Sequence, residues 1–233
     1  GYLIGPTADL TDADLTGADL SDALMPFAHL NGAIMTIANL NGANFWRAEL
    51  TGADLSGADL TSADLTTAIL TNVKSGGITF DGTPPTLPTD WQLIDGYLIG
   101  PGANLFVANL ANTDLSGADL TGADLASATL TNVKSGGITF DGTPPTLPTD
   151  WQLISGYLIG PTADLTNADL TNADLSGANL TGANLTNVKS GGITVIGFPP
   201  TLPTGWQLTD GYLIGPDADL TDADLNEANL TGA

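Results

Sequence analysis

Apolar residues recur every five positions through most of this chain. Every position divisible by five from Leu10 to Leu70 is Leu, Met or Phe, and the same holds in 105–130, 165–185 and 220–230. Ala stands two residues earlier in each pentad, except where Thr113 precedes Leu115. A period of five matches neither the 3.6 residues of a helix turn nor the strict alternation of a long strand. Ala and Leu are two apart and point to one side, so we predict a very short strand followed by a turn.

The stretch ADLSGADLTSADL, residues 53–65, resembles the A(D/N)LXX motif of the pentapeptide-repeat family. Pentads of this kind fill residues 8–70, 103–130, 163–185 and 218–233. The resemblance implies an all-β fold: a right-handed quadrilateral β-helix with four pentads per coil and with Leu and Ala stacked inside. Coils would repeat every twenty residues, at the roughly 4.8 Å spacing of neighbouring strands. We expect residues 1–233 to form a single continuous solenoid, a segment of a longer array.

Three closely similar segments interrupt the pentads, at residues 71–101, 131–161 and 186–216. Each returns to the same frame, as from Leu70 to Leu105, so we expect parts of these inserts to occupy coil positions. Ile78-Thr79-Phe80 would place Ile and Phe where Ala and Leu usually stand. The following TPPTLPT, residues 83–89, would leave the wall, because proline lacks a backbone donor. WQLIDGYLIG, residues 91–100, then predicts a hairpin about Asp95-Gly96; two irregular coil edges are the alternative.

The inserts also carry most of the large aromatic residues, which an Asp-rich wall would not cover. We expect each insert to bury its own aromatics against the leucine-rich arms of its hairpin, as a wing beside the shaft. Successive inserts start 60 and then 55 residues apart, so inserts with equal numbers of coil positions would be rotated by about a quarter turn at one step. The candidate contact residues are Trp91, Tyr97, Trp151, Tyr157, Trp206 and Tyr212.

Twenty residues per coil would also place outward residues above one another, as in the column of Asp9, His29 and Glu49. Residues 21–50 contain the least usual outward positions. There Pro26 would lie below Trp46 and Phe27 below Arg47, which predicts an exposed apolar and cation–π patch. Partner recognition is one interpretation of the patch. The other is that an insert or a neighbouring loop lies over it.

Composition limits the chemistry. Four Lys or Arg against 26 Asp or Glu give a net charge of -22, which disfavours direct binding to nucleic acid or to an acidic membrane surface. There is no cysteine and a single histidine, so no catalytic triad, cofactor site or thiolate metal site can be proposed, and we expect no enzyme activity and no small-molecule substrate. Calcium is conceivable around Asp217 and Asp222, but no EF-hand loop is present, so no metal site is predicted. No apolar run is long enough to span a membrane.

These features favour a non-catalytic structural or protein-interaction scaffold. In its sharper form, this is an acidic rod that binds copies of itself and stacks end to end into filaments. The sequence does not fix the compartment; a bacterial extracellular or surface location is favoured over a cytoplasmic one. The alternative comes from the resemblance, because some family members mimic DNA and protect gyrase from quinolones. Thr ladders suggest a third function, an ice-binding face, but Ser, Asn and Ala interrupt them.

Overall fold

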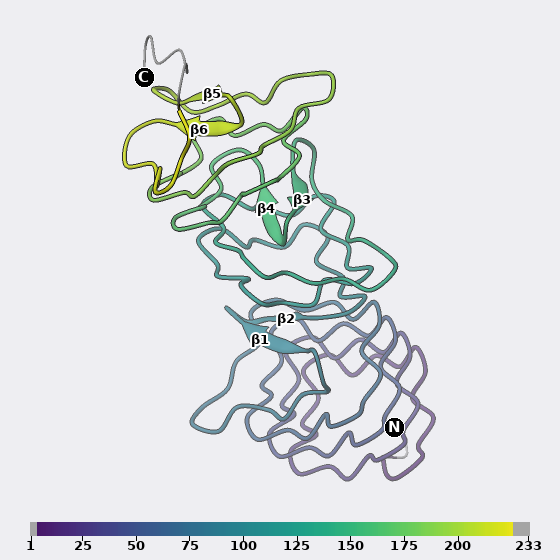
Figure 1. The fold of residues 1–233 in the computed structure, drawn as a ribbon. Helices are drawn as coiled ribbons and strands as arrows, with labels where there is room; N and C mark the ends of the chain where they lie inside the picture. The colour runs from purple at the N-terminus through teal and green to yellow at the C-terminus, as the bar shows by residue number, and fades with distance from the viewer. Residues whose placement is uncertain (1–3, 226–233) are drawn as a thin grey trace. The chain divides into compact units, whose positions relative to one another are not determined.

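A computed structural model of the chain describes residues 4–225, in which every named element is a β-strand (Figure 1). The six strands pair as three antiparallel hairpins, and the rest of the regular structure consists of isolated parallel bridges. The strands are β1 Gln92–Ile94, β2 Tyr97–Ile99, β3 Gln152–Ile154, β4 Tyr157–Ile159, β5 Gln207–Thr209 and β6 Tyr212–Ile214.

Most bridges join residues that are twenty positions apart, so the chain forms a β-helix. Asp9 pairs with His29, and His29 pairs with Glu49, in the predicted column. The backbone N–H of His29 donates to the Ala8 carbonyl at 2.9 Å, and its carbonyl accepts from the Leu10 N–H at 2.7 Å. Within a pentad, only the middle residue uses both its N–H and its carbonyl in the hydrogen bonds that join neighbouring coils. The bridges starting at Asp14, Asp19 and Leu24 follow the same rule, which confirms the period of twenty.

The turns explain the polar part of each pentad. The N–H of Ala13 donates to the Leu10 carbonyl at 3.0 Å, and the second turn residue has a positive φ, for example 63° at Gly17 and 58° at Asn72. Such a turn favours Gly and Asn, which tolerate this conformation. The side chain of the middle Asp supports the same turn, because Asp9 Oδ1 accepts the N–H of Thr11 at 3.1 Å. The Asp residues therefore fix the corners as well as carrying charge.

The described residues form two compact units, each with its own core. The described residues of one unit fall within Gly1–Ala108, Ala118–Ser127 and Thr139–Thr146, and those of the other fall within Asn109–Gly117, Ala128–Ile138 and Leu147–Ala233. Stacked Leu and Ala side chains make up most of both cores, and Leu60 is completely buried. The inward assignment of these residues is therefore confirmed.

The first insert keeps three bridges to the preceding coil: Lys74 to Asp54, Thr79 to Asp59 and Thr86 to Asp64. The prediction that TPPTLPT leaves the wall is therefore wrong. The Thr86 N–H donates to the Ala63 carbonyl at 2.9 Å, and its carbonyl accepts from the Leu65 N–H at 2.9 Å. Because Thr86 is the middle residue, the flanking Pro85 needs no donor of its own. Pro85 is buried in the position of Ala, and Leu87 packs against the core in the position of Leu.

Phe80 also departs from the prediction. Ile78 is buried where Ala would stand, but Phe80 is 47% exposed instead of replacing Leu inside. The bridge from Asp64 to Thr86 spans 22 residues where Asp59 to Thr79 spans twenty, so extra residues leave the coil directly after Thr79. Phe80 lies at the start of that excursion and loses the inward orientation.

The predicted hairpin is present in all three inserts, so the alternative of two irregular edges is wrong. In the first, Asp95 and Gly96 have φ values of 48° and 78°, as a two-residue type I′ turn requires. The picture of a separate wing needs correction, because Leu98 of β2 is fully buried and belongs to the core. Its N–H donates to the buried Ser75 Oγ at 2.9 Å, and equivalent bonds join Leu158 to Ser135 and Leu213 to Ser190.

The coil that contains each insert spans thirty residues, from Lys74 to Asn104, from Lys134 to Asp164 and from Lys189 to Asp219. Lys134 of the second insert and Lys189 of the third lie on columns that pass through Asp164 and Asp169, two residues of consecutive pentads. The third insert therefore starts one column after the second. This shift matches the five-residue difference in their spacing.

Candidate functional site

The predicted surface patch is present, and we call Pro26, Phe27, Trp46 and Arg47 the aromatic corner. The rings of Phe27 and Trp46 meet edge to face, with centroids 4.9 Å apart and planes at 82°. The Arg47 guanidinium carbon lies 4.6 Å from the Trp46 centroid and 6.0 Å from that of Phe27. These distances and the edge-to-face angle lie in the favourable range for aromatic and cation–π contacts.

The aromatic corner is open to solvent. Phe27 is 43% exposed, Arg47 is exposed, and Pro26 and Trp46 are half-buried, so the alternative of a covering insert or loop does not hold for Phe27. Leu24, on the neighbouring column, is exposed as well. These residues form an apolar patch among the exposed acidic residues.

Backbone conformation makes the corner more unusual. Phe27 and Arg47 occupy the second turn position, with φ values of 58° and 57°, where the other pentads mostly have Gly, Asn or Asp. Ile37 has a φ of 53° at the equivalent position of another corner and is 67% exposed. Bulky and β-branched residues are disfavoured in this conformation. These side chains contribute little burial and cost backbone energy, so fold stability does not explain them.

The only histidine forms part of the acidic columns. His29 Nδ1 lies 3.0 Å from Glu49 Oε2, which also accepts from the Asn31 amide at 3.0 Å. The hydrogen bond and the charge of Glu49 raise the pKa of His29. The same hydrogen bond lowers the pKa of Glu49. The two side chains form a surface hydrogen bond that becomes an ion pair when the imidazole is protonated, in agreement with the expected proximity of the two residues.

The insert aromatics pack on glycines of their own inserts. A Cβ on Gly100 would lie 2.4 Å from Trp91 Cδ2, and one on Gly76 would lie 3.0 Å from Tyr97 Cε1. Trp151 and Trp206 lie against Gly160 and Gly215 in the same way. Trp91 also packs against the core of its unit, and Trp151, Tyr157 and Trp206 pack against the core of the other, so the β-helix itself covers part of these aromatic rings.

Two of the tyrosines also satisfy backbone donors. The Tyr157 hydroxyl accepts the N–H of Asp169 at 3.1 Å, and the Tyr212 hydroxyl accepts that of Asp224 at 3.2 Å. A side-chain oxygen thus takes the place of a ladder carbonyl after each of these inserts. We assign these residues a structural role in the β-helix.

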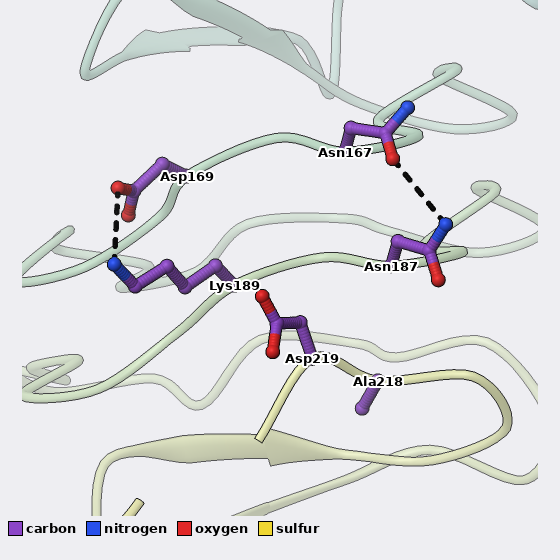
Figure 2. A pocket seen from close by; sticks show the side chains of 6 residues that line it. All are labelled: Asn167, Asp169, Asn187, Lys189, Ala218 and Asp219. Atoms are coloured by element: carbon purple, nitrogen blue, oxygen red, sulfur yellow. Dashed lines mark hydrogen bonds and ion pairs between the residues drawn. The ribbon is translucent and has the colours of Figure 1, made fainter. Parts of the chain in front are cut away.

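The fourth residue of each insert is a lysine that pairs with an aspartate of the preceding coil. Lys74 and Lys134 lie 3.0 Å from Asp54 and Asp114, and Lys189 lies 4.0 Å from Asp169. Lys189 borders a hollow of about 530 Å³ that is lined by Asn167, Asp169, Asn187, Lys189, Ala218 and Asp219 (Figure 2). Asn187 donates to Asn167 at 3.3 Å across this hollow.

The two carboxylates of the hollow take part in ordinary turn contacts. The pKa values of Asp169 and Asp219 are lowered, chiefly by hydrogen bonds from Thr171 and Thr221, the same turn contacts found in the other pentads. Within residues 4–225 no group of three or more His, Cys, Asp or Glu could hold a metal ion. In the same range there is no helix of the length and apolarity that a membrane crossing requires.

Comparison with known proteins assigns the repeats. The family model for pentapeptide repeats matches in eight copies, over residues 8–47, 35–72, 102–134, 163–189 and 216–233, which together exceed half of the chain. The chain belongs to the pentapeptide-repeat family. This family assignment and the parallel bridges identify the fold as a right-handed β-helix. No curated protein matches the sequence.

Solved structures of other pentapeptide-repeat proteins are also similar. Rfr23 of the cyanobacterium Cyanothece 51142 is 29% identical over 34% of this chain and 57% of its own, with a TM-score of 0.20. HetL of Nostoc sp. strain PCC 7120, involved in heterocyst differentiation regulation, is 24% identical over 87% and 90%, with a TM-score of 0.20. Full-length QnrB1, a plasmid-mediated fluoroquinolone resistance protein, is 19% identical over 79% and 80%, with a TM-score of 0.22. The family assignment rests on the repeats.

Sequence reasoning missed two sets of exposed residues. Phe80 and Phe140 have 47% of their surface exposed, because they lie on loops that the five-residue frame had placed inside. Ile37 and Val107 are exposed at turn positions with positive φ. The signal for the second set was available, since large apolar residues replace Gly or Asn in the pentads TIANL and FVANL.

Proposed function

We propose that this pentapeptide-repeat protein is a non-catalytic structural module that binds proteins, above all copies of itself. The aromatic corner carries the proposal. Phe27 and Arg47 are exposed and hold a costly backbone conformation, and both contact Trp46. Residues kept at a cost to stability point to a role in binding.

The wall around the corner suits an assembly module. We infer a quadrilateral coil, because bridges at Asp9, Asp14, Asp19 and Leu24 start separate columns before the first column recurs at His29. We also infer that the three inserts stay bridged to the preceding coil and that the chain resumes the five-residue frame after each hairpin. The inserts and the corner would then add apolar contact points to the acidic surface of each unit.

A non-catalytic role is supported by the causes of the pKa shifts. The carboxylates with lowered pKa values accept hydrogen bonds from turn residues or pair with the lysine or histidine one coil away. These are the contacts of a repeated turn, and they place no unusual acid beside a base. End-to-end stacking into filaments is the sharper form of the same function.

Sedimentation velocity and electron microscopy test the proposal together. We expect the sedimentation coefficient to rise with concentration between about 1 and 100 μM, a range in which weak specific contacts become populated, and fibres or short chains to be visible at the upper end. A single monomeric species over the whole range, at both low and physiological salt, would contradict self-association.

The second candidate function is mimicry of DNA. The net charge of -22 favours it, since a basic DNA-binding groove would attract the acidic wall. The exposed Phe27 and Leu24 disfavour it, because they interrupt the acidic surface with apolar groups. Salt-sensitive binding to gyrase or another topoisomerase, with loss of the enzyme's DNA binding, would support this candidate over the first.

A further inference from the structure

The first two inserts each hold an exposed Phe-Asp pair, which we call a tip: Phe80-Asp81 and Phe140-Asp141. Both Phe rings have 47% of their surface exposed, and both Asp residues are exposed. The repetition of the same exposure in two inserts indicates a defined conformation.

The preceding coil anchors each tip. In the first, the Asp81 N–H donates to Thr61 Oγ1 at 2.9 Å, and the Thr83 carbonyl accepts from the Ser62 N–H at 2.8 Å. In the second, the Asp141 N–H donates to Thr121 Oγ1 at 2.8 Å, and the Thr143 carbonyl accepts from the Gly122 N–H at 2.8 Å. The phenyl rings are thus held outward on short, fixed loops, so little conformational entropy would be lost when they bind.

The aromatic corner offers the complementary chemistry. Arg47 is the only arginine of the chain, and the ion pairs among residues 4–225 involve His29 and the three lysines but not Arg47. Its guanidinium lies over Trp46 and beside Phe27, which leaves donors on its edge for a carboxylate.

We propose that the aromatic corner of one copy binds a tip of a second copy. The Phe80 or Phe140 ring packs against Phe27 and Trp46, and the neighbouring Asp carboxylate pairs with Arg47. This inference rests on the proposed self-association and names its surface. It also explains how two chains of charge -22 can approach, since the contact brings the single guanidinium of the chain to an acid.

The contact predicts the form of the assembly. Corner and tip are different surfaces, so the interface is heterologous and each copy keeps a free corner or tip for the next one. Such contacts give open chains when the rotation between copies does not close a ring. The third insert has Ile196 in the position of Asp81 and lacks the carboxylate, so it would not serve as a tip.

Charge reversal provides the test, with sedimentation velocity as the readout. Arg47→Glu should weaken self-association by at least tenfold, and the double variant Asp81→Arg with Asp141→Arg should weaken it to the same extent. Mixing the two variants should restore it, because the reversed corner then meets reversed tips and the native corner meets native tips. Lys189→Glu is the matched control, since it makes the same change in net charge away from the corner and should assemble as the native chain does.

The outcomes separate this contact from self-association in general. If the native protein assembles and both variants assemble equally well, the proposed contact is wrong while the proposed function stands. If the mixture does not assemble although each variant is folded by circular dichroism, the pairing of corner and tip is wrong. If Arg47→Glu does not fold, the tip variant alone decides, because it changes only exposed loop residues. A native chain that stays monomeric would contradict both proposals.

Discussion

The plain coil from Leu50 to Ile69 and the insert from Thr71 to Pro101 provide the same backbone bridges with different side chains. The plain coil repeats Ala-Asp-Leu, whereas the insert uses Val-Lys-Ser, Ile-Thr-Phe and Pro-Thr-Leu. In both, the middle residue supplies the N–H and the carbonyl of the ladder. The inward residues can therefore vary, provided that other groups fill the interior and satisfy its polar atoms.

Ser75 and Leu98 show how the insert fills the interior. Ser75 stands where the plain coil has Leu, and it is buried. Leu98 from β2 joins the core and gives its N–H to the Ser75 hydroxyl. The hairpin thus supplies, through Leu98, part of the apolar volume that is missing because Ser75 stands in place of Leu. In the plain coil the interior is filled by the Ala and Leu of each pentad. In the insert, Leu98 fills part of it from 23 positions after Ser75.

The largest difference is expected between Leu60→Asp and Leu87→Asp. Leu60 is fully buried in a plain pentad, so an unpaired charge there should cost more than about 4–5 kcal/mol and abolish cooperative unfolding. Leu87 holds the equivalent position in the insert but is only partly buried, so its variant should still unfold cooperatively at a lower temperature. Thermal melting followed by circular dichroism measures both. A cooperative, native-like melt for Leu60→Asp would show that the inward assignment is wrong.

Gly100→Ala tests the packing of aromatics on glycine, which has no counterpart in the plain coil. Its Cβ would lie within 2.8 Å of three Trp91 ring atoms, so the ring must move, at a cost of about 3 kcal/mol. Chemical denaturation followed by tryptophan fluorescence measures the free energy of unfolding. In a Trp91→Ala background, the same substitution should have almost no effect. An equal cost in both backgrounds would contradict the proposed contact.

Ser75→Ala tests the buried hydrogen bond between the Leu98 N–H and the Ser75 hydroxyl. The Leu98 N–H would be left buried without its partner, which costs about 2 kcal/mol. Ser116→Ala, at an exposed turn of a plain pentad, should change the free energy of unfolding by less than about 0.5 kcal/mol. Denaturant titration of the two variants gives the comparison. Equal effects would mean that the buried hydroxyl has no special role.

The smallest expected effect concerns His29, in a plain coil. Because Glu49 raises its pKa, the ion pair stabilises the fold fully below the ordinary value of 6.5 and is lost as the pH rises through the raised pKa. A proton NMR titration of the single histidine ring should give a pKa above 6.5, and Glu49→Gln should return it toward that value. A pKa at or below 6.5 in the native chain would contradict the hydrogen bond.

The sequence predicted the plain coils far better than the inserts, for a physical reason. Ala58 and Leu60 reveal the buried side because they repeat at a fixed period, and the Asp95-Gly96 pair reveals the hairpin because few residues suit its turn. The bridge of Thr86 was missed because the nearby prolines were treated as excluding hydrogen bonds to the next coil. Only the middle residue, Thr86, needs a backbone donor. The packing of Trp91 on Gly100 depends on how β1 and β2 meet the coil, which no local pattern contains.

The positions of the aromatic corner were as predictable from the sequence as those of the plain coils. Pro26, Phe27, Trp46 and Arg47 were brought together by the twenty-residue period alone, since they stand at equivalent corner positions of successive coils. Exposure of the tips was not predictable, because it follows from the two extra residues between Thr79 and Thr86. That the whole chain forms a single continuous solenoid stays a prediction.

The central claim is that the insert remains in the wall with a shift of two residues, and disulfide formation tests it most directly. The chain has no cysteine, so introduced pairs can be read without background. Asp64→Cys with Thr86→Cys should oxidise to an intramolecular disulfide, because these bridged residues have side chains within hydrogen-bond distance, 3.0 Å. Asp64→Cys with Pro84→Cys, at the unshifted spacing, should stay reduced under the same conditions. Disulfide formation by the second pair and not by the first would contradict the account.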